Sequence, residues 1–123
     1  MSNVFLDANS VFDILATRRA WAMEELRGHT VFFSPLSIHI FSYVYKLKMP
    51  QEDVLNGLYH FVPISYTPEI MKSALLGPTK DFEDNVQLHS SVEANADYFL
   101  TQDQDLLKMI FFGKMKMVSK LSK

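Results

Sequence analysis

The chain has 123 residues, of which 48% are hydrophobic and 21% charged, which excludes a disordered chain and leads us to expect a single folded domain over residues 1–123. The formal net charge of -2 gives no global electrostatic argument for nucleic-acid binding, and the lack of cysteine excludes disulfides and thiolate sites. No apolar run is long enough to span a membrane and the first residues lack a secretion signal, so we expect a cytoplasmic protein without a membrane partner.

The first elements alternate between strand and helix. The apolar run Asn3–Leu6 is too brief for a helix and predicts a buried strand. Apolar residues then recur at helical spacing over Ser10–Arg27, which predicts a helix that Gly28 ends. Thr30–Phe33 is β-branched and aromatic, so it predicts a second strand.

A strongly apolar helix follows this second strand. Ser34 can cap the helix and Pro35 suits its first position, and we expect the helix to reach about Lys48. Residues 38–47 are apolar nearly all round the helix. We therefore expect this helix to be buried, or half of it to face a partner such as a second copy of the chain.

The second half continues the alternation. In chain order we expect a helix at residues 50–58, a strand at 61–64, helices at 67–76 and 81–96, a strand at 98–100, a short helix at 103–108 and a strand at 116–118. Strands that alternate with helices are typical of an α/β fold with a mainly parallel sheet.

Charge is distributed unevenly along the second half. Between Asp81 and Asp105 there are seven acidic residues and no Lys or Arg, whereas from Lys108 onward there are five lysines and no acid. Such runs often form solvated surfaces. The basic tail, together with Arg18, Arg19 and Arg27, can also supply phosphate contacts around an acidic pocket.

Three acidic residues are expected at one edge of the sheet. Asp7 follows the first strand, and Asp103 follows the strand at 98–100. Asp84 lies in the first turn of the helix before that strand, which starts at the same edge if it packs antiparallel to the strand. Clustered carboxylates repel unless a cation neutralises them, and an all-oxygen set suits Mg²⁺ or Mn²⁺ rather than Zn²⁺.

Three segments resemble the PIN domain in order and spacing. They are Val-Phe-Leu-Asp-Ala-Asn at residues 4–9, Asp-Phe-Glu-Asp-Asn-Val-Gln at 81–87, and Ala-Asn-Ala-Asp-Tyr-Phe-Leu-Thr-Gln-Asp at 94–103. The stretch from Asp81 to Leu106 is similar to the second half of the PilT amino-terminal, VapC-like branch. Members of that branch are typically metal-dependent ribonucleases, often the toxin halves of toxin–antitoxin pairs. The resemblance implies a three-layer α/β/α fold around a mainly parallel sheet of four or five strands.

The resemblance also implies a site. Asp7, Asp84 and Asp103 fall on the acidic metal and catalytic positions of the family, and Asn9 and Thr101 fall on its polar supporting positions. Asp81 and Asp105 are further supporting candidates from the same acidic block. The implied cofactor is Mg²⁺ or Mn²⁺ and the implied substrate is RNA, single-stranded or structured. The implied protein partners are an antitoxin and a second copy of the chain.

One position departs from the family. The helix after the second strand usually carries Ser-x-x-Ser-x-x-Glu, and here the corresponding residues are Ser34, Ser37 and Ile40. Isoleucine ligates nothing, and Asp81, one helical turn before Asp84, is the nearest acid to compensate. Two functions therefore remain open. One is a Mg²⁺- or Mn²⁺-dependent endoribonuclease, and the other is a PIN-like binding module that cleaves poorly or not at all.

Overall fold

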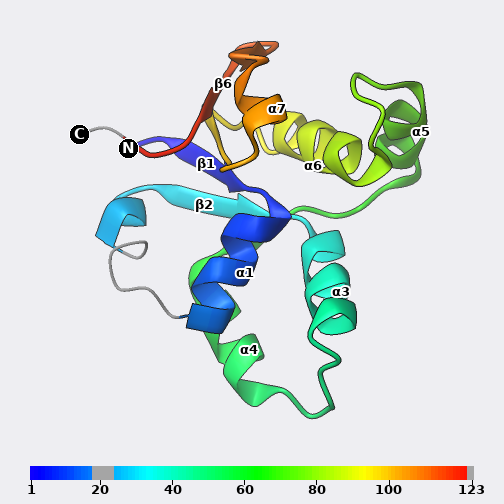
Figure 1. The fold of residues 1–123 in the computed structure, drawn as a ribbon. Coiled ribbons are helices and arrows are strands. Elements are labelled where there is room, and N and C mark those ends of the chain that lie inside the picture. Colours follow the sequence, from blue (N-terminus) through cyan, green and yellow to red (C-terminus); the bar gives the residue numbers. More distant parts are fainter. Residues whose placement is uncertain (18–23, 122–123) are drawn as a thin grey trace.

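The computed structural model describes residues 1–17 and 24–121, and at its centre is a sheet of six strands in the order β3-β2-β1-β4-β6-β5 (Figure 1). The strands are β1 (Asn3–Leu6), β2 (Thr30–Phe33), β3 (Val62–Pro63), β4 (Tyr98–Leu100), β5 (Phe111–Phe112) and β6 (Met115–Val118). All neighbouring strands pair in parallel except β5 and β6, which are antiparallel. The expected mainly parallel α/β sheet is confirmed. The strand that the sequence did not predict is β5.

Helices cover both faces of this sheet. They are α1 (Ala8–Thr17), α3 (Pro35–Val44), α4 (Glu52–Gly57), a 3₁₀ turn (Leu58–His60), α5 (Pro68–Leu76), α6 (Phe82–Glu93) and α7 (Gln104–Leu107). Figure 1 shows α1, α3 and α4 on one side of the sheet, and α6 and α7 on the other with α5 beside α6. The expected three-layer arrangement is therefore confirmed. No described helix has the length and apolar character that crossing a membrane requires.

The helix that we expected over Ser10–Arg27 is only partly described. Its first part is α1, which begins at Ala8 because the side chain of Asp7 caps it. Residues 18–23, which include Arg18 and Arg19, lie outside the described residues.

The alternation of side chains along the strands divides the core in two. In β1, Val4 and Leu6 join the cluster beneath α1, with Val31, Phe33 and Leu100. Phe5 points to the other face, where it joins the cluster with Leu88, Phe99, Leu106 and Met117. Successive residues of a strand face opposite sides, so the run Val4-Phe5-Leu6 supplies both cores and is apolar throughout.

Two helices end earlier than the sequence predicted, and the same backbone motif ends both. After α3, Lys46 has a positive φ of 50° and the Leu47 N–H donates to the Ser42 carbonyl over 3.0 Å. After α6, Asn95 has a φ of 53° and the Ala96 N–H donates to the Ser91 carbonyl over 3.1 Å. This is the left-handed cap that commonly closes helices. Neither position carries glycine, the usual residue of this cap, so the two helix ends are weakly marked in the sequence.

Candidate active site

The candidate site lies at the edge of the sheet where the parallel strands end. The register places Leu6 beside Leu100, and Leu100 beside Val118, so β1, β4 and β6 end at the same level. Asp7 directly follows β1, and Asp103 caps α7 shortly after β4. As expected, the topology brings these two acids to one edge.

Asp7 is buried and held at both carboxylate oxygens. Its Oδ1 accepts the Ser10 N–H over 2.8 Å, which caps α1, and its Oδ2 accepts the Thr101 hydroxyl over 2.5 Å. Only 6% of Asp7 is exposed. Burial raises the pKa of Asp7 above its usual value, the hydrogen bonds from Thr101 and Ser10 oppose the rise, and the negative charge of Asp103 adds to it.

Thr101 connects Asp7 with Asp103. Its side chain is fully buried, and while its hydroxyl donates to Asp7, the same oxygen accepts the backbone N–H of Asp103 over 3.0 Å. Asp103 in turn uses Oδ1 to accept the N–H groups of Asp105 and Leu106. One hydroxyl thus fixes the spacing between two of the acids that the sequence assigned to the site.

Asp84 enters the same electrostatic environment from the start of α6. Its N–H donates to Oδ1 of the capping Asp81 over 2.9 Å, and its side chain is half-buried. Burial raises its pKa to about 6, with further contributions from the negative charges of Asp81, Asp103, Asp7 and Glu83, in that order. The pKa of Asp84 therefore depends on the charges of Asp7 and Asp103, the two other predicted metal ligands.

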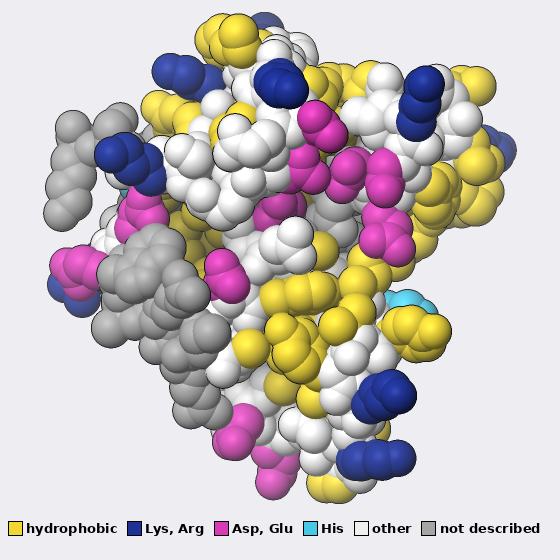
Figure 2. All heavy atoms as spheres, viewed as in Figure 1, with side chains coloured by type: hydrophobic (Ala, Val, Ile, Leu, Met, Phe, Trp, Pro, Cys, Tyr) yellow, Lys and Arg dark blue, Asp and Glu magenta, His cyan; other side chains and the backbone are white. Residues whose placement is uncertain are grey.

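Figure 2 shows acidic side chains gathered over the start of α6 and the region of α7. Within the described residues, no basic side chain lies within ion-pair distance of Asp7, Asp84 or Asp103, and the described ion pairs join Arg27 to Glu24 and Lys108 to Asp105. The negative charge at this edge is thus not balanced by a described basic side chain.

The donors at this edge match a hard divalent cation in chemistry. They are carboxylate oxygens, which Mg²⁺ and Mn²⁺ prefer. Across residues 1–17 and 24–121, however, no three His, Asp or Glu side chains are close enough together to hold one metal ion. The charges of Asp7 and Asp103 act on Asp84. That the three aspartates together bind a metal stays a prediction.

The remaining predicted site residues are more peripheral. Asn9 is exposed on α1, and Asp81 is an exposed cap of α6. Asp105 is exposed, and its carboxylate faces Lys108 Nζ at 3.9 Å. Neither Asn9 nor Asp105 has a side-chain hydrogen bond to the three central aspartates.

Ile40 is half-buried on α3, and two buried serines, Ser34 and Ser37, lie at the start of this helix. Ser34 caps the helix by accepting the Leu36 N–H over 3.2 Å. Ser37 is fully buried and its hydroxyl accepts the side-chain amide of Gln87 over 3.1 Å. This bond joins α3 to α6, so the helix that carries position 40 is tied to the helix that carries Asp84.

Sequence reasoning missed Ser10. The Ser10 N–H donates to the carboxylate of Asp7, which caps α1. The Ser10 hydroxyl donates to the Leu100 carbonyl over 3.2 Å, which ties α1 to the end of β4. The three-residue spacing from Asp7 to Ser10 is that of a helix cap and its N3 residue, and it was the available signal.

The basic residues are spread over both edges of the sheet. Arg27 precedes β2, and Lys114 lies in the turn between β5 and β6, so both are at the edge opposite the aspartates. Lys120 follows β6 and is at the aspartate edge. The expected phosphate contact from Arg27 does not fit this placement.

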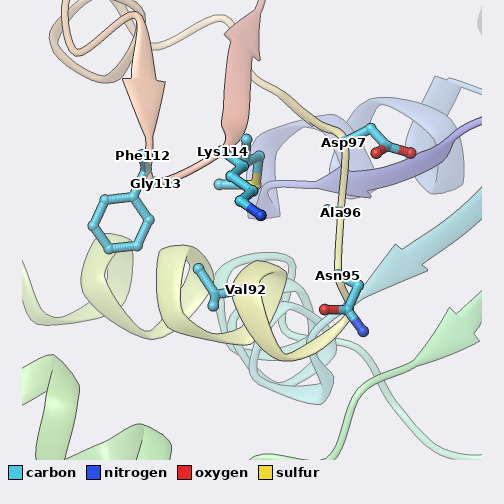
Figure 3. Close-up of a pocket in the computed structure, with 8 residues that line it drawn as sticks. Val92, Asn95, Ala96, Asp97, Phe112, Gly113 and Lys114 are labelled. Carbon is cyan, nitrogen blue, oxygen red and sulfur yellow. The ribbon is translucent and has the colours of Figure 1, made fainter.

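A pocket of about 320 Å³ also lies at the opposite edge (Figure 3). Lys114 and Phe112 reach from the β5–β6 turn towards α6, which supplies Val92. Asp97 is the acidic residue among those that line the pocket, and its carboxylate accepts the Asn3 N–H over 2.8 Å. The pocket therefore does not include the aspartate group.

Comparison with known proteins identifies the fold. No family model and no curated protein matches the sequence. A chain in the structure of VapBC2 from Rickettsia felis, bound to a DNA fragment from the promoter, matches with a TM-score of 0.67 and 11% identity, over 94% of this chain and 97% of that chain. This chain has a VapC-like PIN fold. VapC20 from Mycobacterium tuberculosis, described as a Sarcin-Ricin loop cleaving toxin, shares the PIN fold with a TM-score of 0.64 and 11% identity, over 92% and 98% of the two chains.

Thr101→Val is expected to destabilise the protein by about 2 kcal/mol, because it leaves the Asp7 carboxylate and the Asp103 N–H without their shared partner. Thr101→Ser keeps the hydroxyl and is expected to retain most of the stability. Urea unfolding of the three proteins measures the difference. A loss for Thr101→Ser with none for Thr101→Val would show that the methyl group matters and the hydroxyl does not.

Asp84→Asn is expected to stabilise the metal-free protein above pH 6 by about 1 kcal/mol, a value reduced for solvent screening. The raised pKa of about 6 means that the folded state holds the Asp84 proton more tightly than the unfolded chain does, so stability falls as pH rises from about 4 to 6. The gain is therefore expected to vanish below pH 4. Thermal unfolding in a chelator across this range tests it, with Glu83→Gln as the control for removing a charge from the same helical turn.

Proposed function

We propose that this protein is a metal-dependent endoribonuclease of the PIN type, with Asp7, Asp84 and Asp103 as its catalytic and metal-binding residues. The observation that carries the proposal is the placement of Asp7 after β1 and Asp103 after β4 at the carboxyl edge of the sheet, with Asp84 at the start of α6 near enough that their charges raise its pKa. Open α/β sheets bind their ligands at that edge. The charges of Asp103 and Asp7 raise the pKa of Asp84, and such repulsion between carboxylates favours a cation among them.

The three aspartates that would hold Mg²⁺ or Mn²⁺ differ in how strongly hydrogen bonds restrain their carboxylates. Asp7 is fixed at both oxygens, so it would offer a rigid carboxylate, and each oxygen keeps further lone-pair capacity. Asp103 uses Oδ1 for its cap, and within the described residues its Oδ2 has no hydrogen bond. Asp84 is half-buried and accepts no hydrogen bond from a described residue, so it can turn towards a ligand. A divalent cation bound here supplies charge neutralisation and Lewis-acid polarisation of a phosphodiester.

We also propose that the protein is the toxin half of a toxin–antitoxin pair and forms a homodimer. VapC20 is described as a toxin that cleaves the Sarcin-Ricin loop, and the Rickettsia structure is of a VapBC2 assembly. Large apolar side chains support a protein interface on this chain. Tyr43 on α3 is 81% exposed, and Leu75 and Leu76 at the end of α5 are 69% and 91% exposed.

A second candidate function is a PIN-fold binding module with weak or no cleavage. Ile40 favours it, because the resembling family has glutamate at this position on the helix after β2. Asp81 does not replace that carboxylate directly, since its Oδ1 already caps α6 and its side chain is exposed.

Adding Mn²⁺ is expected to raise the thermal unfolding temperature of the wild-type protein and to support cleavage of single-stranded or hairpin RNA. Asp7→Asn, Asp84→Asn and Asp103→Asn are expected to reduce both effects at least tenfold, because each removes one charged ligand. Glu93→Gln, at the other end of α6, is the matched control and is expected to behave as wild type. Binding without cleavage would favour the binding module, and a Mn²⁺ shift that survives all three Asn variants would place the metal elsewhere.

Ile40→Glu is expected to raise Mn²⁺-dependent cleavage by about tenfold above a weak wild-type rate, because it adds the carboxylate that the resembling family carries. Ile40→Gln has a similar shape without the charge and is expected to give no gain. Single-turnover cleavage of a labelled RNA compares the three proteins. Robust wild-type cleavage in Mg²⁺ that Ile40→Glu leaves unchanged or lowers would contradict the assignment of this position.

A further inference from the structure

Three aromatic rings form a cluster between α1 and α3. Phe12 of α1 lies 5.3 Å from Phe41 of α3, centroid to centroid, and Phe41 lies 4.8 Å from Tyr45 at the end of α3. The ring of Tyr45 also meets Phe12 edge-on at 6.1 Å. Phe41 is only 3% exposed, so it anchors the other two rings.

Tyr45 is held in place and yet open to solvent. It is 51% exposed although it contacts both other rings. A nucleobase can stack on such a ring at low entropic cost, because the contacts already restrict the side chain. Tyr43, although more exposed, is about 200° away round the helix from Tyr45 and has no ring contact with a described aromatic residue.

The cluster lies next to the aspartate edge. Helix α1 begins directly after Asp7, and at 1.5 Å per residue Phe12 is about 7 Å along it. Helix α3 begins after Ser34, where β2 ends, and Tyr45 lies at its far end, about 15 Å away. Figure 2 shows hydrophobic side chains over α1 and α3 directly below the acidic group.

Two lysines extend this surface away from the acids. Lys46 and Lys48 follow Tyr45 and are both exposed. Figure 2 shows basic side chains beyond the far end of α3. The face therefore passes from carboxylates through aromatic rings to ammonium groups.

We propose that this face is a binding track for single-stranded RNA, made of Phe12, Tyr45, Lys46 and Lys48. An unpaired base stacks on Tyr45, Lys46 and Lys48 contact the backbone phosphates, and the strand leads to the aspartate edge. The proposal rests on the proposed ribonuclease function for the identity of the ligand. Ammonium groups beside an aromatic ring match the alternation of phosphate and base in a single strand, whereas a protein helix docking on an apolar face needs no cations.

The track predicts RNA binding without cleavage. With a chelator present, fluorescence anisotropy of a labelled oligoadenylate is expected to give about tenfold weaker binding for Tyr45→Ala than for the wild type. Tyr45→Phe keeps the ring and is expected to bind as wild type does, and Tyr59→Ala, which removes an exposed ring from the 3₁₀ turn, is the control. The double variant Lys46→Gln/Lys48→Gln is expected to reduce the slope of log Kd against log salt by about 1.4.

The outcomes separate the track from the ribonuclease. Tyr45-dependent binding by a protein that never cleaves would support the track and reject the ribonuclease. Cleavage and binding that Tyr45→Ala and the double lysine variant leave unchanged would support the ribonuclease and overturn the track. A wild type that binds no oligoadenylate would also overturn the track. Dimers that Tyr45→Ala dissociates in light scattering, with RNA binding intact, would assign the face to a second copy of the chain. Circular dichroism checks that each variant is folded.

Discussion

The buried carboxylate of Asp7 is the contact on which the arrangement at this edge depends. It caps α1 through the Ser10 N–H and accepts the hydroxyl of Thr101 beyond β4, so it joins two elements that are far apart in sequence. The Thr101 hydroxyl oxygen also accepts the N–H of Asp103, whose side chain caps α7. A short chain of hydrogen bonds thus sets the start of two helices relative to two adjacent strands. The same carboxylate is also one of the acids that lie at this edge.

The hydrogen bonds to Asp7 also explain why its environment differs electrostatically from that of Asp84. The hydrogen bonds that hold Asp7 favour its charged form, whereas burial opposes that form. Asp84 has no such bonds from described residues, and its pKa rises to about 6. The fold therefore holds the Asp7 carboxylate by hydrogen bonds, whereas the Asp84 carboxylate accepts none from a described residue.

Much of the fold could be predicted, because the elements at the centre carry strong local signals. The runs at Asn3–Leu6 and Thr30–Phe33 are strands with the predicted bounds, and Pro68–Leu76 is a helix that Thr67 caps as its position suggests. The ends of α3 and α6 were misplaced, because they depend on left-handed residues other than glycine. β5 was missed because it has two residues and forms only against β6.

The site was predictable in its location and less so in its detail. The carboxyl ends of parallel strands must share an edge, so topology alone placed Asp7 near Asp103. Which side chains turn inward depends on tertiary contacts. Thr101 is buried by its bond to Asp7, whereas Asn9 and Asp105 face solvent despite similar positions in the chain. No periodicity in the sequence distinguishes these cases.

The buried bond between Ser37 and Gln87 has a consequence for how easily this edge can change its chemistry. Sliding or turning α3 would leave two buried polar groups without a partner, so this pair holds α3 against α6. The Ile40 side chain takes no part in that bond. A substitution at position 40 can therefore change the chemistry of α3 while the bond that ties this helix to α6 stays in place.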